Sequence, residues 1–170
     1  MPSDDTRWSD ERPPPSLRVR FRAGEPAYGL FGRLAARNLE PSCRAFARLH
    51  RLSFETDVLR GRVNGRVAEL AGLEEGLVSR HTVAALDNGW VALDGEYLTT
   101  RSWQPKRGRF CPECFREDLL GDDGRHGPFE SRAFRRSWWD VSLIEHCTVH
   151  DVAFARKCPR CGRSQDVDDA

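Results

Sequence analysis

Apolar residues near the beginning of the chain recur with the period of a helix. Over residues 25–38 they fall at positions i, i+3, i+4, i+7 and i+8, the stripe of an amphipathic helix packed on a core. The residues of this stripe are Ala27, Leu30, Phe31, Leu34 and Ala35. Pro26 suits the first turn of the helix and Asn38 suits its end. Arg33 and Arg37 lie off the stripe, so we expect them on a solvated face.

Two shorter stripes follow. A second helix is expected from Pro41, with Cys43 as a small buried side chain rather than a metal ligand. The third stripe consists of Val63, Val67, Leu70 and Ala71. It ends at Gly72, and a short helix is expected after it. Ala68 and Gly72 match the tight corner of a helix-turn-helix, because Ala allows close approach and Gly allows positive φ. The second helix, "EEGLVSRH", begins with two acids that repel phosphate, so contact with a protein is favoured as much as contact with DNA.

The segment between the helices and the cysteines predicts a small hairpin. In "WVALDGEYLTT", Asp94-Gly95 is flanked by apolar residues, which is a two-residue turn signal. We expect this hairpin to bridge two halves of the chain, and "QPKRGR" to be a linker. The polar residues Met1 to Arg22, with "RPPP", predict a disordered leader, and "SQDVDDA" predicts a frayed acidic tail.

The composition indicates the number of domains and the cellular compartment in which the protein acts. The chain has 170 residues, of which 39% are hydrophobic and 31% charged, enough for one or two small domains. No stretch approaches the roughly 18 apolar residues of a membrane span, and the first residues lack the apolar run of a signal peptide. We therefore expect a cytoplasmic protein without membrane contact. In that reducing setting, paired cysteines indicate metal or redox chemistry more often than disulfides.

Charge is a weaker signal. The net charge is +1, and only two of the 27 basic residues are lysines, Lys106 and Lys157. Arginine suits phosphate and carboxylate, although a GC-rich genome also raises its frequency. Over residues 101–163, 13 basic residues stand against 9 acidic ones. That excess is compatible with nucleic acid but is well short of a basic nucleic-acid-binding domain.

Five of the six cysteines fall into three pairs of ligand-type residues, each with a two-residue gap. The pairs are Cys111/Cys114, Cys147/His150 and Cys158/Cys161. A two-residue gap lets a tight turn aim both side chains at one ion, and a tetrahedral zinc needs two such turns. We expect one Zn²⁺ on the first two pairs, Cys111, Cys114, Cys147 and His150. The thiolates must lose their protons, so binding and folding are coupled.

The third pair leaves alternatives open. Cys158 and Cys161 form a possible second half-site, or they close the first site in place of Cys147 and His150. A redox Cys-x-x-Cys would need a thioredoxin-like βαβ context, which the sequence does not show. A Cys147/His150 nucleophile would need an orienting acid, for which only Glu145 is near. Because four ligands close a zinc site, we expect a structural ion and no enzymatic activity.

The turns that carry Cys111/Cys114 and Cys147/His150 are called the first and second knuckles here. A basic-aromatic cluster lies between them in the sequence: Arg135, Arg136, Trp138 and Trp139. One tryptophan is expected to pack under the knuckles, which have little other core. The arginines, Arg135 and Arg136, are expected to be exposed. With Trp138 they are candidates for contact with a partner or with nucleic acid.

These patterns predict an α+β fold. A small helical domain with a helix-turn-helix is expected over residues 23–104, followed by a zinc-ribbon domain over 105–163. A disordered leader, 1–22, and an acidic tail, 164–170, flank the two domains.

The segments "FCPECFRED" and "RRSWWDVSLIEHCTVHDVAFARKCPRCG" together resemble the TniQ family of transposition proteins. That family carries a Cys-Pro-x-Cys knuckle with a following acidic pair, an Arg-x-x-Trp approach, a Cys-x-x-His knuckle and a Cys-Pro-x-Cys-Gly knuckle. The segment "GEPAYGLFGRLAARN" resembles the family's opening helix, with Pro26 in place of the usual small polar residue. The matching positions are Glu25, Leu30, Arg33, Leu34 and Asn38.

The resemblance implies a non-enzymatic, nucleoid-associated adaptor for target selection in transposition. Such proteins contact an AAA+ ATPase regulator and, in some systems, target DNA or a CRISPR effector. The family's second ribbon usually continues with another Cys-x-x-Cys, which does not follow Gly162 here. The competing hypothesis is a stand-alone DNA-binding transcription regulator with a zinc ribbon and a helix-turn-helix, which would need a strongly basic face.

Overall fold

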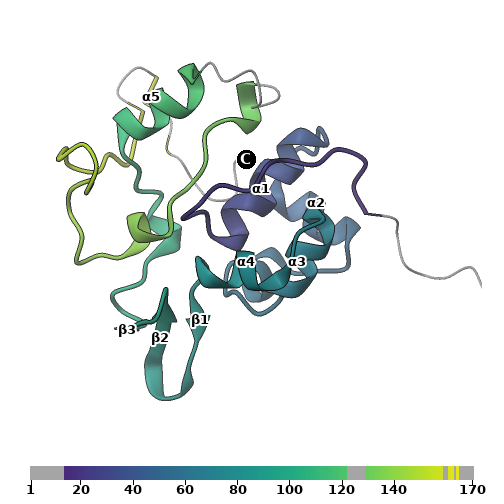
Figure 1. The fold of residues 1–170 in the computed structure, drawn as a ribbon, viewed down its shortest axis with the longest axis horizontal. Coiled ribbons are helices and arrows are strands. Elements are labelled where there is room, and N and C mark those ends of the chain that lie inside the picture. The colour runs from purple at the N-terminus through teal and green to yellow at the C-terminus, as the bar shows by residue number, and fades with distance from the viewer. Residues whose placement is uncertain (1–13, 122–128, 159–160, 163, 165–170) are drawn as a thin grey trace, which may run out of the picture.

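The computed structural model describes residues 14–121, 129–158, 161, 162 and 164. Within these residues the architecture is α+β: five α-helices, several short 3-10 or π turns and one three-stranded antiparallel sheet (Figure 1). The α+β prediction is confirmed at this level. Residues 1–13 of the expected leader and 165–170 of the expected tail lie outside the described residues.

The helical region, residues 27–80, contains the largest core. Its elements are α1 (Ala27–Arg37), α2 (Cys43–Leu49), a π turn η1 (Phe54–Val58), α3 (Asn64–Ala71) and α4 (Glu75–Arg80). Seventeen buried side chains form one cluster to which all five elements contribute. Helix α1 is central, since it packs on α2, η1 and α3. Ser42 caps α2 by accepting the Ala45 amide at 3.1 Å, close to the expected start of that helix at Pro41.

The corner between α3 and α4 has the backbone that its sequence predicts. Gly72 ends α3 in the left-handed conformation, with φ of 69°, which glycine adopts at least cost. The Leu73 amide donates to the Ala68 carbonyl at 2.8 Å and closes the turn. Cys43 is fully buried in the adjoining core, as expected. The two helices are confirmed, while the use of their corner as a helix-turn-helix on DNA stays a prediction.

The expectation that Arg33 lies on a solvated face is wrong. Its guanidinium donates to both carboxylate oxygens of Glu25, at 2.9 and 2.8 Å, and Arg33 and Glu25 are 6% and 0% exposed. Its Nε donates to the Ser131 carbonyl at 2.8 Å, from a segment far along the chain. The helical period marks a polar face correctly, but it does not reveal that another part of the chain covers that face.

Part of the expected disordered leader is ordered. Val19 and Phe21 pack against the helical core. Asn38, at the end of α1, accepts the Leu17 amide at 3.2 Å and donates to the Leu17 carbonyl at 2.8 Å. Residues 14–22 therefore lie along the helical region, and the prediction of disorder is wrong for them.

The sheet has the order β1 (Ala84–Ala85), β2 (Trp90–Leu93), β3 (Glu96–Thr99) and is antiparallel throughout. Asp94 and Gly95 both have positive φ, 53° and 88°, as a two-residue turn requires, so the hairpin prediction is confirmed. The sheet projects from the body of the molecule (Figure 1). Val91 and Leu93 of β2 join Val83, which precedes the sheet, and two later residues, Trp103 and Val141, in a second buried cluster.

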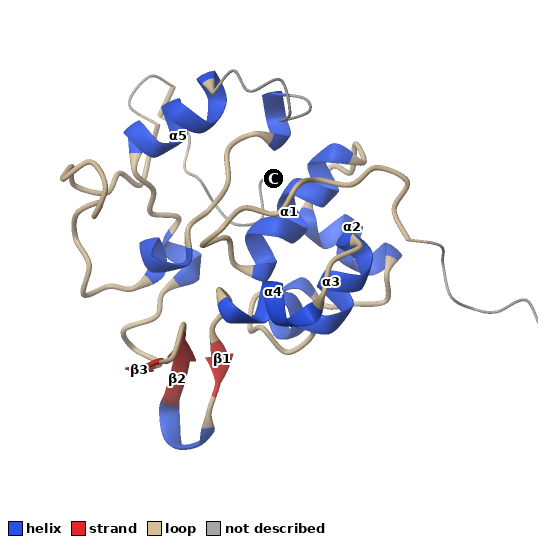
Figure 2. Cartoon of the chain, in the orientation of Figure 1, coloured by secondary structure: helices blue, strands red, loops and turns tan. Residues whose placement is uncertain are grey.

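The cysteine region, residues 105–121 and 129–158, has little regular structure (Figure 2). Its elements are α5 (Pro112–Leu120) and three 3-10 turns, η3 (Pro105–Arg107), η4 (Phe129–Ser131) and η5 (Ser137–Asp140). The expected linker "QPKRGR" is part of the fold instead. Arg109 is buried and donates to the carbonyls of Val141 and Ile144, at 2.6 and 2.9 Å.

The two regions meet along α1 and the residues before it. The Ser137 amide donates to the Gly24 carbonyl at 2.9 Å. Trp138 packs on Gly24 so closely that a Cβ there would lie 2.6 Å from the indole, and Gly24 has φ of 82°. Among the described helices, none has the length and apolar character needed to cross a membrane.

Candidate metal centre

The first cysteine knuckle is built into the start of a helix. Cys111 is the N-cap of α5, and its Sγ accepts the Cys114 amide at 3.4 Å. Pro112 occupies the first helical position, where a missing N–H has no cost. The sulfur therefore lies at the positive end of the helix dipole, which favours the thiolate.

The second knuckle is a tight turn without a helix. The Cys147 amide donates to the Val152 carbonyl, and the Asp151 amide donates back to the Cys147 carbonyl, both at 2.8 Å. Asp151 adopts φ of 53°, a conformation that Asp tolerates better than most residues. The turn holds the side chains of Cys147 and His150 toward the start of α5.

The four side chains converge, and four of the distances among their ligand atoms are close to those of a tetrahedral zinc site. Their ligand atoms all lie within 4.8 Å of one another. Cys114 Sγ lies 3.6 Å from Cys147 Sγ, and His150 Nδ1 lies 3.6, 3.4 and 3.7 Å from the sulfurs of Cys111, Cys114 and Cys147. Zinc bond lengths of ~2.3 Å to sulfur and ~2.0 Å to nitrogen imply tetrahedral edges of about 3.5–3.8 Å. The donor set and its spacing therefore fit a metal ion of this kind.

Glu117 orients the histidine from the outside. Its Oε1 lies 2.9 Å from His150 Nε2, so this nitrogen carries the proton and Nδ1 directs its lone pair toward the sulfurs. This hydrogen bond raises the pKa of His150 and lowers the pKa of Glu117. Carboxylate partners of this kind fix the tautomer of a metal-bound histidine and increase its basicity.

The thiols need a cation to ionise together. Burial raises the pKa of the Cys114 thiol well above its usual value, although the charge of Arg136 opposes this. Burial also disfavours the Cys147 thiolate, but hydrogen bonds from the backbone amides of Val149 and His150, together with the side chains of His150 and Cys111, outweigh it and lower the pKa of Cys147 to about 7. Three thiolates this close together repel one another, so the fully ionised cluster would be stable only with a cation such as a divalent metal ion among them.

A small aromatic core supports the cluster. Trp139 is 0% exposed and lies beside Phe110, Phe115 and Phe154. One tryptophan under the knuckles was expected, and Trp139 takes this place, while Trp138 is half-buried against Gly24.

The arginines expected to be exposed are instead bound within the fold. Arg135 pairs with Asp140 and Arg136 pairs with Asp118, the latter through two contacts at 2.8 and 3.0 Å. The side chains of these two arginines are 12% and 11% exposed. Both expectations of exposure are wrong, because buried carboxylates in the same region provide partners. Their contact with another molecule stays an untested prediction.

The third pair lies outside the cluster. Cys158 is half-buried and Cys161 is exposed, and neither belongs to the group of four in the part of the chain that the structure describes. The arrangement agrees with the first of the two pairings considered from the sequence. It does not support replacement of Cys147 and His150 by the third pair.

Two acidic residues matter more than the sequence indicated. Glu117 and Asp118, the pair after the first knuckle, hold His150 and Arg136. Their position in the TniQ-like pattern was the only signal for them. Glu25 and Asp140 gave no signal, since burial of a carboxylate depends on contacts remote in sequence.

The fold and the cluster define a class of small α+β proteins with a Cys₃His cluster that could hold a metal ion. The chain belongs to the TniQ family, whose model matches residues 16–154 and thus most of the chain. Proteins of this family are accessory proteins of transposition. The match includes all four clustered residues and ends before Cys158. No curated protein matches the chain.

Proposed function

We propose that this protein is an adaptor in DNA transposition that links target recognition to an AAA+ ATPase regulator. The observation that carries the proposal is the TniQ match over residues 16–154, which spans the helical region and the metal centre together. In this role the protein acts beside DNA in the cytoplasm, at the nucleoid. Its further partner is target DNA or a CRISPR effector.

We propose Zn²⁺ as the bound ion, held by Cys111, Cys114, Cys147 and His150 in a zinc-ribbon domain over residues 105–163. Three thiolates and one imidazole at tetrahedral spacing favour zinc over harder cations, which prefer oxygen ligands. The three cysteines are buried, and four protein ligands leave no position for a substrate. This arrangement supports a structural ion and a non-enzymatic protein.

The adaptor role predicts recruitment that depends on nucleotide. The zinc-loaded, tagged protein is used to capture proteins from a lysate of its own host, with ATP or without nucleotide. Mass spectrometry is expected to identify an AAA+ ATPase in the ATP sample and not in the other. Capture of no AAA+ ATPase in either sample would contradict the proposal. A tight, sequence-specific shift of naked DNA without any ATPase would point to the transcription regulator instead.

A further inference from the structure

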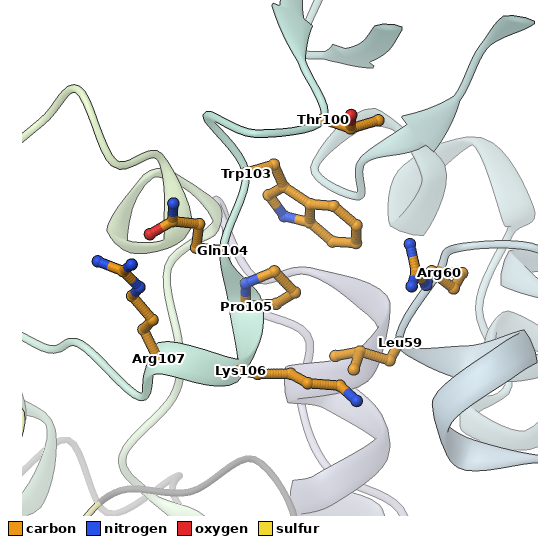
Figure 3. A pocket seen from close by; sticks show the side chains of 8 residues that line it. All are labelled: Leu59, Arg60, Thr100, Trp103, Gln104, Pro105, Lys106 and Arg107. Atoms are coloured by element: carbon orange, nitrogen blue, oxygen red, sulfur yellow. The ribbon is translucent and has the colours of Figure 1, made fainter. Parts of the chain in front are cut away.

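A cavity of about 430 Å³ lies between the end of η1 and the segment 100–107, where the helical region approaches the cysteine region (Figure 3). Its apolar walls are Leu59, Trp103 and Pro105. Three cationic side chains also line it: Arg60, Lys106 and Arg107. Figure 3 shows Arg60 opposite the Trp103 ring and Lys106 beside Leu59, with Arg107 directed away on the other side of the segment. No acidic residue is among those lining the cavity.

The cavity lies where two segments rich in cations and free of acids come together. Residues 58–68 and 97–112 contain seven arginines and lysines and no aspartate or glutamate. Of these seven, Arg66 pairs with Glu69 and Arg109 donates to backbone carbonyls. The remaining five are exposed and form what we call the cationic rim: Arg60, Arg62, Arg101, Lys106 and Arg107.

The cationic rim lacks internal counter-charges. Within the described ranges, no rim side chain makes an ion pair. Glu55 is in electrostatic reach of Lys106, but its carboxylate is bound by Arg44. Arg60, Lys106 and Arg107 line the recess itself, while Arg62 and Arg101 lie on the same two segments. Uncompensated cations around a recess repel one another, and an anion bound there would relieve that repulsion.

The backbone that carries the cationic rim is held in place on both sides. The Gln104 amide donates to the Asp140 carbonyl at 2.8 Å, and the Ser142 amide donates to the Ser102 carbonyl at 2.7 Å. On the other side, the Arg62 amide donates to the Asp57 carbonyl at 2.9 Å. Binding on such a fixed surface loses little conformational freedom.

We propose that the cationic rim binds the phosphodiester backbone of duplex DNA without reading its base sequence. Four of the five rim residues are arginines, whose guanidinium matches phosphate in two-point contacts. Phosphate contacts of this kind position a protein on DNA and carry no sequence information. A membrane surface is a poor match, because Leu59 and Trp103 are buried and no exposed large apolar side chain lines the cavity.

This inference rests on the proposed adaptor role and adds to it the surface that would contact DNA. Its test is DNA binding, whereas the test of the adaptor role is recruitment of an ATPase. The inference also differs from DNA binding by α4, whose start carries Glu74 and Glu75. The two sites can be separated experimentally because Arg80, an exposed cation of α4, is not among the residues lining the cavity.

The test is the salt dependence of binding to duplex DNA. The zinc-loaded full chain is titrated into a fluorescein-labelled 30-base-pair duplex of arbitrary sequence, and anisotropy is measured from 50 to 300 mM KCl. Each phosphate contact contributes about −0.9 to the slope of log K against log[KCl]. The variant R60Q/K106Q/R107Q is expected to lower the magnitude of that slope by about 2.7 and weaken binding on the order of 10²-fold at 100 mM KCl. R80Q, the matched control, is expected to leave the slope unchanged.

Each other outcome overturns the proposal. Wild-type protein that does not bind the duplex at 50 mM KCl removes the site altogether. If the triple variant is folded and loaded with zinc but has the wild-type slope of log K against log[KCl], the cationic rim does not contact DNA. An effect of R80Q on the slope as large as that of the triple variant assigns the contact to α4. Poly-L-glutamate that competes as well as DNA of equal charge, through the same three residues, assigns the cationic rim to an acidic protein.

Discussion

The helical region buries seventeen side chains in one cluster, whereas the cluster around the metal centre contains five, three of which are cysteines. Burial of ordinary apolar side chains contributes about 1.5–3 kcal/mol each, so the helical region has ample hydrophobic stabilisation. In the cysteine region, Phe110 and Trp139 cannot supply a comparable amount. The comparison teaches that the two regions cannot draw on the same source of stability, and the proposed ion at Cys111, Cys114, Cys147 and His150 would supply what the second region lacks.

The largest expected effect is loss of the ion. Cys111→Ser, or removal of zinc with a strong chelator, removes a binding free energy of about 10 kcal/mol from the cysteine region. Amide exchange of residues 110–121 and 137–157 is expected to become fast, while α1 and α3 stay protected. Hydrogen-exchange mass spectrometry measures both regions in one experiment.

Cys43→Ala is the matched control, since Cys43 is buried in the helical core and is not one of the four clustered residues. This variant is expected to keep its zinc and the protection of the cysteine region. Equal protection of residues 110–121 with and without the ion would show that the two regions do not differ in the way described.

The next effect concerns the contact between the regions. Arg33→Met leaves the Glu25 carboxylate buried without its partner and removes the hydrogen bond to Ser131. Breaking a buried pair from one side costs about 3–5 kcal/mol, which urea unfolding of the zinc-loaded protein at pH 7.5 measures. The double variant E25Q/R33M is expected to recover part of this loss. A loss below ~1 kcal/mol for Arg33→Met would show that the regions are not joined through this pair.

The same pair gives the helical region a dependence on pH. Burial raises the pKa of Glu25 to about 7, although Arg33 opposes this shift. Between pH 4.5 and 7 the folded protein holds a proton that the unfolded chain has released, so this group makes the protein less stable as pH rises. The stability of wild type relative to Glu25→Gln is expected to fall by about 2 kcal/mol from pH 5 to pH 7.5. If the stability of wild type relative to Glu25→Gln stays constant or rises with pH, the pKa of Glu25 is not raised in the folded protein.

A smaller effect is expected from Glu117, which touches the metal centre only through His150. Loss of such an outer hydrogen bond lowers metal affinity by about 10–100-fold. Glu117→Gln is therefore expected to weaken zinc binding to this extent in competition with a chromophoric chelator. Glu113→Gln is the control, because Glu113 lies on the same helix and pairs with Arg116. Similar zinc affinities for the two variants would show that Glu117 does not support metal binding through His150.

The sequence predicts most of what depends on local pattern. The stripe from Ala27 to Ala35, the Gly72 corner and the Asp94-Gly95 hairpin follow from periodicity and turn chemistry, and the structure contains all three. The grouping of Cys111, Cys114, Cys147 and His150 follows from knuckle spacing, since two-residue gaps nearly fix the geometry of each half-site.

Contacts between remote segments were not predictable in this way. Arg33, Arg135 and Arg136 look like surface residues in their own segments, yet each is bound by a carboxylate. Asp118 comes to Arg136 from another segment, whereas Glu25 and Asp140 are close in sequence to their arginines. The order of residues 14–22 likewise depends on the end of α1, where Asn38 binds Leu17. Neither the helical nor the strand period reports these partners, whether the partner lies a few residues away or in another segment.

The most direct test of the account is zinc X-ray absorption on the purified protein, with elemental analysis of the same sample. We expect one zinc per chain with three sulfur ligands at about 2.3 Å and one nitrogen at about 2.0 Å. A first shell of four sulfurs, a shell of oxygen or nitrogen alone, or no stoichiometric zinc would contradict the Cys₃His centre.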